Sequence, residues 1–247
     1  MLNSYRKNVF SQNGEDGVIL FLLKKLKLLN KSNDLWCCEF GAWDGVNGSN
    51  TFNLVKNFNF KAVFIEADKK KYSDLLTTKK NYSNIIAINK FVDFNYKSKN
   101  SLDNILKKTK ISKTFEVLSI DIDSFDLAVW KSLQRYRPKI VVIEINSGIK
   151  PGKKQVHSKD RQGNSFTSTV NFAKKNGYEL VCHTGNCIFV AKKYIKALNI
   201  NKKYIKHPKM LFDYSWINLK ENIFKKYAKK FLPIFLIELL QKFKKLI

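Results

Sequence analysis

The chain of 247 residues is 44% hydrophobic and 13% aromatic, which is enough for one buried α/β domain with an extension and excludes a disordered chain. Its formal net charge of +26 comes almost entirely from lysine, because arginine occurs only at positions 6, 135, 137 and 161. Lysine suits forked recognition of bases and phosphates less than arginine does, so the charge does not predict specific nucleic-acid binding, although it would attract anionic surfaces. No apolar run reaches the ~20 residues that a membrane-spanning helix needs.

The cysteines show no metal or redox motif. They are Cys37, Cys38, Cys182 and Cys187, and neither pair has the spacing of a zinc site. Adjacent Cys37 and Cys38 are predicted to point to opposite faces of a strand. We expect reduced thiols in the core. The polar N-terminus has no apolar signal region, so the expected location is the cytoplasm.

Residues 1–34 are predicted to form an N-terminal helical segment. Ser11 or Asn13 is predicted to cap its helix, with the acidic residues that follow in the first turn. The other interpretation is a lid in which Gln12 or Glu15 touches a bound ligand. The polar cluster by itself does not decide between the two.

Residues 35–191 alternate between short apolar runs and helical patterns. Near-continuous apolar runs separated by helices indicate parallel strands that are buried on both faces. Two further apolar runs flank the short Gly-containing connection 183–186 and predict a C-terminal antiparallel hairpin. The predicted fold is therefore an α/β, doubly wound open sheet. Its parallel strands are expected at 35–40, 62–66, 85–88, 115–121 and 140–144.

The first predicted strand leads into a glycine turn that contains Glu39, Gly41, Asp44 and Gly45. Glycine permits positive φ and a close approach of the backbone to a ligand. The turn offers carboxylates and no positive charge, so it suits an ammonium, a sulfonium or sugar hydroxyls better than a diphosphate. It therefore favours S-adenosylmethionine (SAM) over a dinucleotide. The competing interpretation is an ordinary strand–turn–helix corner with solvated acids.

Four of the predicted strands end in or near an acid, namely Glu39, Glu66, Asp121 and Glu144. Ligands of open α/β sheets bind outside the carboxyl ends of the strands, and Glu66 lies where an acid holds the vicinal hydroxyls of a ribose. Asp121 and Asp123 place two carboxylates on the same side of an extended segment, and Glu144 with Asn146 repeats that spacing. Asp121, Asp123 and Glu144 are therefore candidate ligands of a hard cation such as Mg²⁺, unless Asp123 caps the helix that follows.

Several segments become informative in combination. They are SQNGEDGVI at 11–19, EFGAWDGVNGSNT at 39–51, VFIEAD at 63–68, LSIDIDSFDLAVW at 118–130 and PKIVVIEIN at 138–146, with GNSF, AKKNGYELV and GNCIFV later. Over roughly Ser11 to Val190 the sequence resembles the FkbM-type family of SAM-dependent methyltransferases. This resemblance implies a class I methyltransferase (Rossmann-like) domain over residues 35–191. Such a domain has a mostly parallel seven-stranded sheet whose last strand is antiparallel.

The resemblance also implies an activity and roles for the site residues. The activity is O-methylation of a hydroxyl group on a sugar, a glycan or a related small-molecule acceptor. The glycine turn would line the methionine and ribose side of SAM through Glu39, Gly41, Asp44 and Gly45. Glu66 would bind the ribose, and Asp121 would sit near the methyl group.

A methyl transfer of this kind needs an aligned acceptor oxygen and a group that removes its proton. Asp121 is the first candidate for the base or for a metal ligand. His157 is the alternative, because its loop follows the fifth strand and is placed to cover the acceptor. His183, at the hairpin, is predicted to be structural.

Residues 192–247 are predicted to form a basic helical extension. Within it, 218–247 intersperse lysines among large apolar residues, and Pro233 kinks or splits the helix. Such a sequence suits peripheral contact with an anionic membrane surface. It equally suits packing on its own domain or on another subunit of a homo-oligomer.

Two other activities remain open at this point. In a glycosyltransferase, Asp121 and Asp123 would hold a nucleotide-sugar diphosphate through a metal. In an RNA methyltransferase, Phe58, Phe60 and Tyr96 would stack bases. The glycine turn and the acid after the second strand fit SAM better, and the lysines are spread over the chain rather than gathered in a stripe. A non-catalytic scaffold would not explain the unpaired acids at the strand ends.

Overall fold

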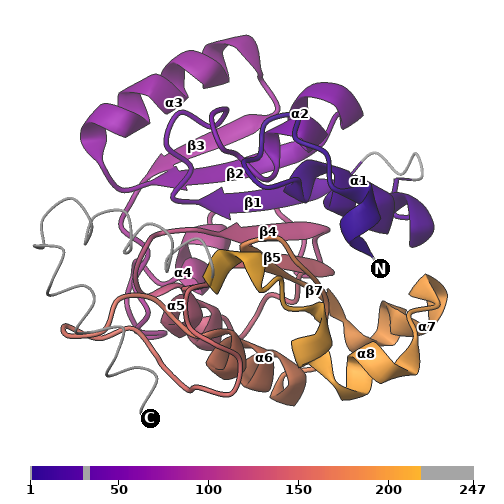
Figure 1. Cartoon of the computed structure of the whole chain (residues 1–247). Coiled ribbons are helices and arrows are strands. Elements are labelled where there is room, and N and C mark those ends of the chain that lie inside the picture. The colour runs from indigo at the N-terminus through magenta and orange to yellow at the C-terminus, as the bar shows by residue number, and fades with distance from the viewer. Residues whose placement is uncertain (1, 30–33, 218–247) are drawn as a thin grey trace, which may run out of the picture.

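The computed structural model describes residues 2–29 and 34–217, which form a seven-stranded sheet with helices on both faces (Figure 1). Its strands are β1 (Trp36–Phe40), β2 (Lys61–Glu66), β3 (Ile85–Asn89), β4 (Val117–Ile120), β5 (Ile140–Glu144), β6 (Tyr178–His183) and β7 (Asn186–Ala191). Their order is β3-β2-β1-β4-β5-β7-β6, and only β7 runs antiparallel to its neighbours. The predicted doubly wound, mostly parallel sheet with a C-terminal antiparallel hairpin is confirmed.

Helices follow most of the strands. They are α1 (Glu15–Lys25), α2 (Phe52–Phe58), α3 (Lys69–Asn81), α4 (Leu102–Leu106), α5 (Asp126–Ser132), α6 (Phe166–Lys175), α7 (Ile195–Leu198) and α8 (Lys202–Lys206). α6 is capped at both ends. The Ser165 hydroxyl accepts a hydrogen bond from the backbone N–H of Ser168 at its start, and Gly177 follows its end with a φ of 78°.

The start of α1 differs from the prediction. Its N-cap residue is Gly14, with a φ of 88°, so neither Ser11 nor Asn13 occupies the N-cap position. The Ser11 hydroxyl nevertheless accepts the backbone N–H of Asp16 in the first turn at 3.1 Å, so the predicted capping by Ser11 is confirmed in part. The cause is Asp16, whose carboxylate accepts the backbone N–H groups of Val9, Phe10 and Ser11. The preceding loop therefore wraps around this acid, while its Ser11 hydroxyl bonds the first turn of the helix.

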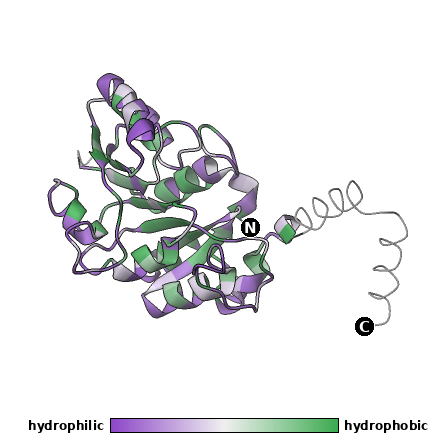
Figure 2. Cartoon of the chain, turned by 90° about the vertical axis from the view of Figure 1, so that its left-hand side faces the viewer, coloured by the Kyte–Doolittle hydropathy of each residue, from purple (hydrophilic) through white to green (hydrophobic). Residues whose placement is uncertain are grey.

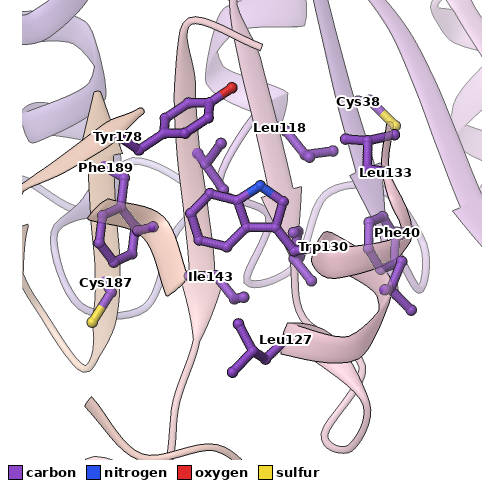
Figure 3. Close-up of a cluster of buried hydrophobic side chains, with 14 of the residues drawn as sticks. Cys38, Phe40, Leu118, Leu127, Trp130, Leu133, Ile143, Tyr178, Cys187 and Phe189 are labelled. Atoms are coloured by element: carbon purple, nitrogen blue, oxygen red, sulfur yellow. The ribbon is translucent and has the colours of Figure 1, made fainter. Parts of the chain in front are cut away.

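Two apolar layers enclose the sheet. Helices α4, α5 and α6 cover one face, where the indole of Trp130 packs against Tyr178 and Phe189 with ring centroids 5.5 and 5.3 Å apart (Figure 3). Helices α1, α2, α3 and α7 cover the other face. Cys37 and Cys38 are buried in opposite layers, as predicted, and all four cysteines are free thiols.

Hydrophobic residues are concentrated in the strands at the centre of the molecule and hydrophilic residues on the outer helices (Figure 2). The N-terminal segment belongs to this packing, because Val18, Ile19, Leu22 and Leu23 of α1 are fully buried in the second layer. Among the described helices, none combines the length and the apolar character that crossing a membrane requires.

Residues 192–217 return along the sheet as short helical pieces, η2 (Lys192–Tyr194), α7, α8 and η3 (Pro208–Leu211). Buried Leu211, Phe212 and Ile217 pack into the apolar layer that α4, α5 and α6 cover. Its Asp213 pairs with Arg6 near the other end of the chain, with 3.1 Å between the charged atoms. The amphipathic helix predicted for 218–247 lies outside the described residues.

Candidate active site

Two adjoining cavities border the carboxyl ends of the parallel strands. The larger, of about 490 Å³, is lined in part by Asp121, Asp123 and Glu144. The smaller, of about 160 Å³, is lined in part by Gly41 and Glu66. Asp123 lines both cavities, so they meet at this residue. They lie where the strand order reverses between β1 and β4, which is the position at which open α/β sheets bind ligands.

Gly41 lies so close to the backbone of Asp121 that a residue with a side chain would not fit there. Its φ is 77°, and a Cβ added there would lie 1.7 Å from the carbonyl oxygen of Asp121. Its backbone N–H donates to the carbonyl of Ile65 at 3.1 Å. The turn after β1 is thereby clamped between the ends of β2 and β4, and its backbone forms part of the cavity wall.

Glu66, the last residue of β2, is held in a fixed orientation. One carboxylate oxygen accepts the N–H of Trp43 and the other accepts the N–H of Asp68, both at 2.8 Å. A carboxylate has about four acceptor positions, so each oxygen keeps one for a ligand. Exposed Phe91 and half-buried Ile122 offer apolar surface in the same cavity.

The smaller cavity also carries positive charge, because Lys71 and Lys90 contribute to its lining. The Lys71 ammonium lies 5.6 Å from the ring centroid of Trp43. Trp43 has a φ of 45°, so a second residue of the turn after β1 adopts the left-handed conformation.

Three residues of the glycine turn line neither of these cavities. Glu39 is buried, and its carboxylate accepts the hydroxyls of Ser49 and Thr51 at 2.6 Å each and the backbone N–H of Asn50. Burial raises its pKa, against the effect of these hydrogen bonds. The acid therefore fixes the start of α2 rather than facing a ligand.

Asp44 and Gly45 likewise act within the turn. Asp44 accepts the backbone N–H groups of Val46 and Asn47 at 2.8 Å each. A Cβ on Gly45, whose φ is 78°, would lie within 3.1 Å of the Leu75 and Phe64 side chains. Both residues shape the loop that carries Gly41.

Asp121, Asp123 and Glu144 come together as the sequence predicts. One carboxylate oxygen from each of the three residues lies within 4.8 Å of the corresponding oxygens of the other two. Burial, followed by repulsion from neighbouring carboxylates, raises the pKa of Asp121 to about 7 and that of Glu144 to about 8. A positive charge placed among them would lower both pKa values, so the cluster suits a cation.

The residues around the cluster fix its backbone. Asp126, not Asp123, organises the start of α5, because its carboxylate accepts the N–H groups of Ile122 and Ser124 at 2.8 and 3.0 Å. Asp123 has a φ of 59°, a left-handed conformation that is uncommon for a residue with a side chain. Asp123 is therefore available to a ligand rather than used as a helix cap.

A hard divalent cation takes oxygen ligands, so the three clustered carboxylates fit Mg²⁺ in chemistry and in spacing. Asn146, which the sequence places beside them, holds the loop after β5. Its amide nitrogen donates to the carbonyl of Gln162, and its amide oxygen accepts the N–H of Gly148.

His157 lies beside the larger cavity and does not line it. Its Nδ1 accepts the N–H of Gly163 at 3.1 Å, and its ring meets Phe125 edge-on with 4.5 Å between centroids. Gly163 and Asn164, from the same loop, do line the cavity. The loop after β5 therefore borders the site, whereas His157 itself is held by contacts with Gly163 and Phe125.

The N-terminal segment contributes to the site through two amides. Gln12 and Asn13 line the larger cavity, which agrees with the interpretation of this segment as a cover for a ligand. Glu15 is fully buried and accepts the hydroxyl of Thr184 at 2.6 Å, so it fastens α1 to the hairpin.

Sequence reasoning missed Gln162, Asn186 and Trp216, which also line the larger cavity. The indole of Trp216 lies against Gly185, where an added Cβ would be 2.5 Å from the ring. No local sequence pattern marks Gln162 or Trp216 as a site residue, because each reaches the cavity only through tertiary folding. A glycine at the turn of the hairpin is the one trace of the Trp216 contact in the sequence.

His183 has a structural role behind the larger cavity. The Ser147 hydroxyl donates to the carbonyl of Gly185 at 2.7 Å and therefore accepts from Nε2 of His183, 2.9 Å away. Nδ1 accepts the N–H of Asp213 at 3.0 Å. Burial lowers the pKa of His183 to about 4, so the ring is neutral with its proton on Nε2.

No family model and no curated protein matches the sequence. Among solved structures, the chain is similar to M. capricolum TrmK in complex with S-adenosylhomocysteine (SAH), at 15% identity and a TM-score of 0.47, over 91% of this chain and 92% of that one. It is also similar to the precorrin-6y C5,15-methyltransferase of Geobacter metallireducens, at 15% identity and a TM-score of 0.45, over 75% and 93%. The N-terminal domain of EvdMO1, solved in the presence of SAH and D-fucose, is 11% identical with a TM-score of 0.45, over 75% and 84%. At such identities none of them assigns an activity or a substrate to this chain.

Proposed function

We propose that the chain is a SAM-dependent methyltransferase of the FkbM type, which methylates a hydroxyl of a sugar, a glycan or a related small molecule. The observation that carries the proposal is the pair of cavities that meet at Asp123. One contains an oriented carboxylate suited to a ribose, and the other contains a carboxylate cluster suited to a cation. An elongated ligand with a diol at one end and a positive charge further along fits both.

The donor would lie across the two cavities. Its ribose hydroxyls would donate to the free acceptor positions of Glu66, and its adenine would lie against Phe91 and Ile122 in the smaller cavity. The backbone of Gly41 would allow the chain of the donor to pass close to Asp121. Glu39, Asp44 and Gly45 would support this arrangement by holding the turn.

SAM supplies a methyl group that is already activated by its sulfonium. The acceptor oxygen would attack this methyl group, the carbon–sulfur bond would break, and SAH would leave with the bonding electron pair. Asp121 would take the hydroxyl proton, and a pKa of about 7 suits a base that works near neutral pH. His157 is the second candidate, from the loop that borders the same cavity.

Asp121, Asp123 and Glu144 are also the residues that would hold Mg²⁺. The ion would make the acceptor hydroxyl more acidic. If Asp121 acts only as a base, a chelator should leave methyl transfer unchanged, whereas if Asp121 acts as a metal ligand, the chelator should inhibit methyl transfer.

Methyl transfer from labelled SAM tests the proposal, with wild type, Asp121→Asn and His157→Ala assayed on a panel of hydroxylated acceptors. Loss of a positioned general base costs roughly 10²- to 10⁴-fold, and we expect that loss for Asp121→Asn. Near-normal turnover of Asp121→Asn would remove Asp121 from the mechanism. Inhibition of wild type by a chelator, reversed by Mg²⁺, would identify the metal-dependent route.

We also propose that the basic amphipathic sequence 218–247 contacts anionic membranes at their surface. Co-sedimentation with anionic and neutral vesicles tests this, using the full chain and a variant in which Lys225, Lys226, Lys229 and Lys230 become Glu. Equal binding of both proteins to anionic vesicles would end the membrane proposal.

A further inference from the structure

The larger cavity differs in charge from the rest of the protein. Lysine and arginine make up 46 of the 247 residues, yet none of the described residues that line this cavity is basic. Asp121, Asp123, Asp126 and Glu144 contribute to its wall, and most of the remaining lining groups are neutral amides and glycines. A strongly basic protein thus has an acidic and neutral acceptor cavity.

Three of the amides keep their hydrogen-bonding groups free. The side-chain amides of Gln12, Asn13 and Gln162 make no hydrogen bond to any part of the chain that the structure describes. Each amide offers two donors and an acceptor oxygen, and a hydroxyl group needs one of each. The cavity therefore presents unused partners for several hydroxyls, from two segments that lie far apart in the sequence.

Other amides in the same wall are already engaged. Asn164 is buried, accepts the backbone N–H of His157 at 3.1 Å and donates to the carbonyl of Ser124 at 3.4 Å. Asn186 donates to the carboxylate of Glu15 at 3.3 Å. These residues hold the frame of the cavity, which separates them from the three amides available to a ligand.

Trp216 adds an aromatic wall, with its indole fixed against Gly185. A sugar ring has hydroxyls around its edge and carbon–hydrogen faces, so it matches a wall of amides next to an aromatic surface. A carboxylate or phosphate on the acceptor would find no cation among the described lining residues. In the metal-free protein it would also be repelled by those neighbouring acids that are ionised.

We infer that the larger cavity selects a sugar without an anionic group, whose hydroxyls are bound by the amides of Gln12, Asn13 and Gln162 and whose ring packs against Trp216. This inference rests on the proposed function and narrows its acceptor. It excludes uronic acids, sugar phosphates and the phosphodiester backbone of RNA from this cavity.

Calorimetric titration of the full chain saturated with SAH, in the presence of a chelator, tests the inference. The ligands are a neutral oligosaccharide, matched uronate and phosphorylated oligosaccharides, and a short single-stranded RNA. We expect the neutral sugar to bind at least tenfold more tightly than its anionic counterparts, and Trp216→Ala to weaken that binding at least fivefold.

A change of charge gives a sharper test. Gln162→Lys places a cation in the wall and should reduce the preference for neutral over phosphorylated sugar at least fivefold. Gln134→Lys adds the same charge at an exposed position between α5 and β5, outside the lining residues, and should leave the preference unchanged.

Tighter binding of the uronate, the phosphorylated sugar or the RNA by wild type would overturn the inference. So would binding of none of the ligands, or equal shifts from Gln162→Lys and Gln134→Lys. Titration of the same preparations with SAM, before SAH is added, separates the two proposals. Absence of SAM binding refutes the methyltransferase, whereas SAM binding with anionic preference refutes only the acceptor assignment.

Discussion

The carboxylate cluster should make the free protein less stable as the pH rises, and Asp121→Asn should remove much of this effect. In the unfolded chain the Asp121 carboxyl loses its proton near its ordinary pKa of 3.8, whereas burial and neighbouring acids raise the folded pKa to about 7. Between these values the folded state binds more protons, so the free energy of unfolding falls as the pH rises. The stability is fully present below about pH 4 and is lost through pH 7.

The size of the effect follows from the shift. A change of about three pKa units corresponds to roughly 4 kcal/mol at 1.36 kcal/mol per unit. Asp121 keeps some contact with solvent and shares its titration with Glu144, so we expect about half of that amount. Asp121→Asn should therefore match wild type near pH 4 and exceed its unfolding free energy by about 2 kcal/mol near pH 8.5.

Urea unfolding at several pH values, in the presence of a chelator and without SAM, measures this difference. Asp74→Asn is the matched control, because it removes the same charge from the exposed surface of α3. A wild-type stability that stays flat between about pH 5.5 and pH 8.5 would refute the reasoning. So would Asp121→Asn being the less stable protein at the higher pH.

Three further outcomes follow from particular contacts. Gly41→Ala should destabilise the fold by about 2–4 kcal/mol, because the added methyl meets the Asp121 carbonyl at a positive φ, and a wild-type Tm would contradict this contact. Glu39→Ala should lower the free energy of unfolding by about 2–4 kcal/mol, because the buried hydroxyl and N–H donors at the start of α2 lose their acceptor. Urea unfolding measures this change. Loss of SAM binding at unchanged stability would instead assign Glu39 to the ligand. The pKa of His183 is lowered to about 4, so its contribution to stability is present above pH 6.5 and is lost as the pH falls toward 4. His183→Gln should therefore reduce the loss of stability between pH 6.5 and pH 4. An unchanged loss in this pH range would contradict a buried neutral ring.

The sheet was predictable because its signals are local. The run from Ala62 to Ile65 is apolar at every position, and all four residues are buried in the structure. Such a pattern is typical of a parallel strand covered on both faces. Once the strands were placed, the convergence of Asp121, Asp123 and Glu144 followed from their positions at neighbouring strand ends.

Glu39 shows where sequence reasoning fell short. An acid at the end of an apolar strand looks the same whether it faces a ligand or a helix start, and its partners Ser49 and Thr51 lie ten and twelve residues further along the chain. Those hydroxyls could have been recognised as partners of the acid. For Gln162 and Trp216 there was no such signal, because their places in the cavity depend on the loop after β5 and on the segment after the sheet.

Titration of the full chain with SAM, for wild type and Glu66→Ala, tests the central claim most directly. Two charge-assisted hydrogen bonds to the ribose, at roughly 1.5–3 kcal/mol each, predict at least a tenfold loss of affinity even if one of them is partly replaced by water. The melting temperature of each protein shows that the comparison is made on folded chains. We predict that wild type binds SAM and that Glu66→Ala binds it at least tenfold more weakly; no binding by wild type, or equal binding by both, would contradict the account.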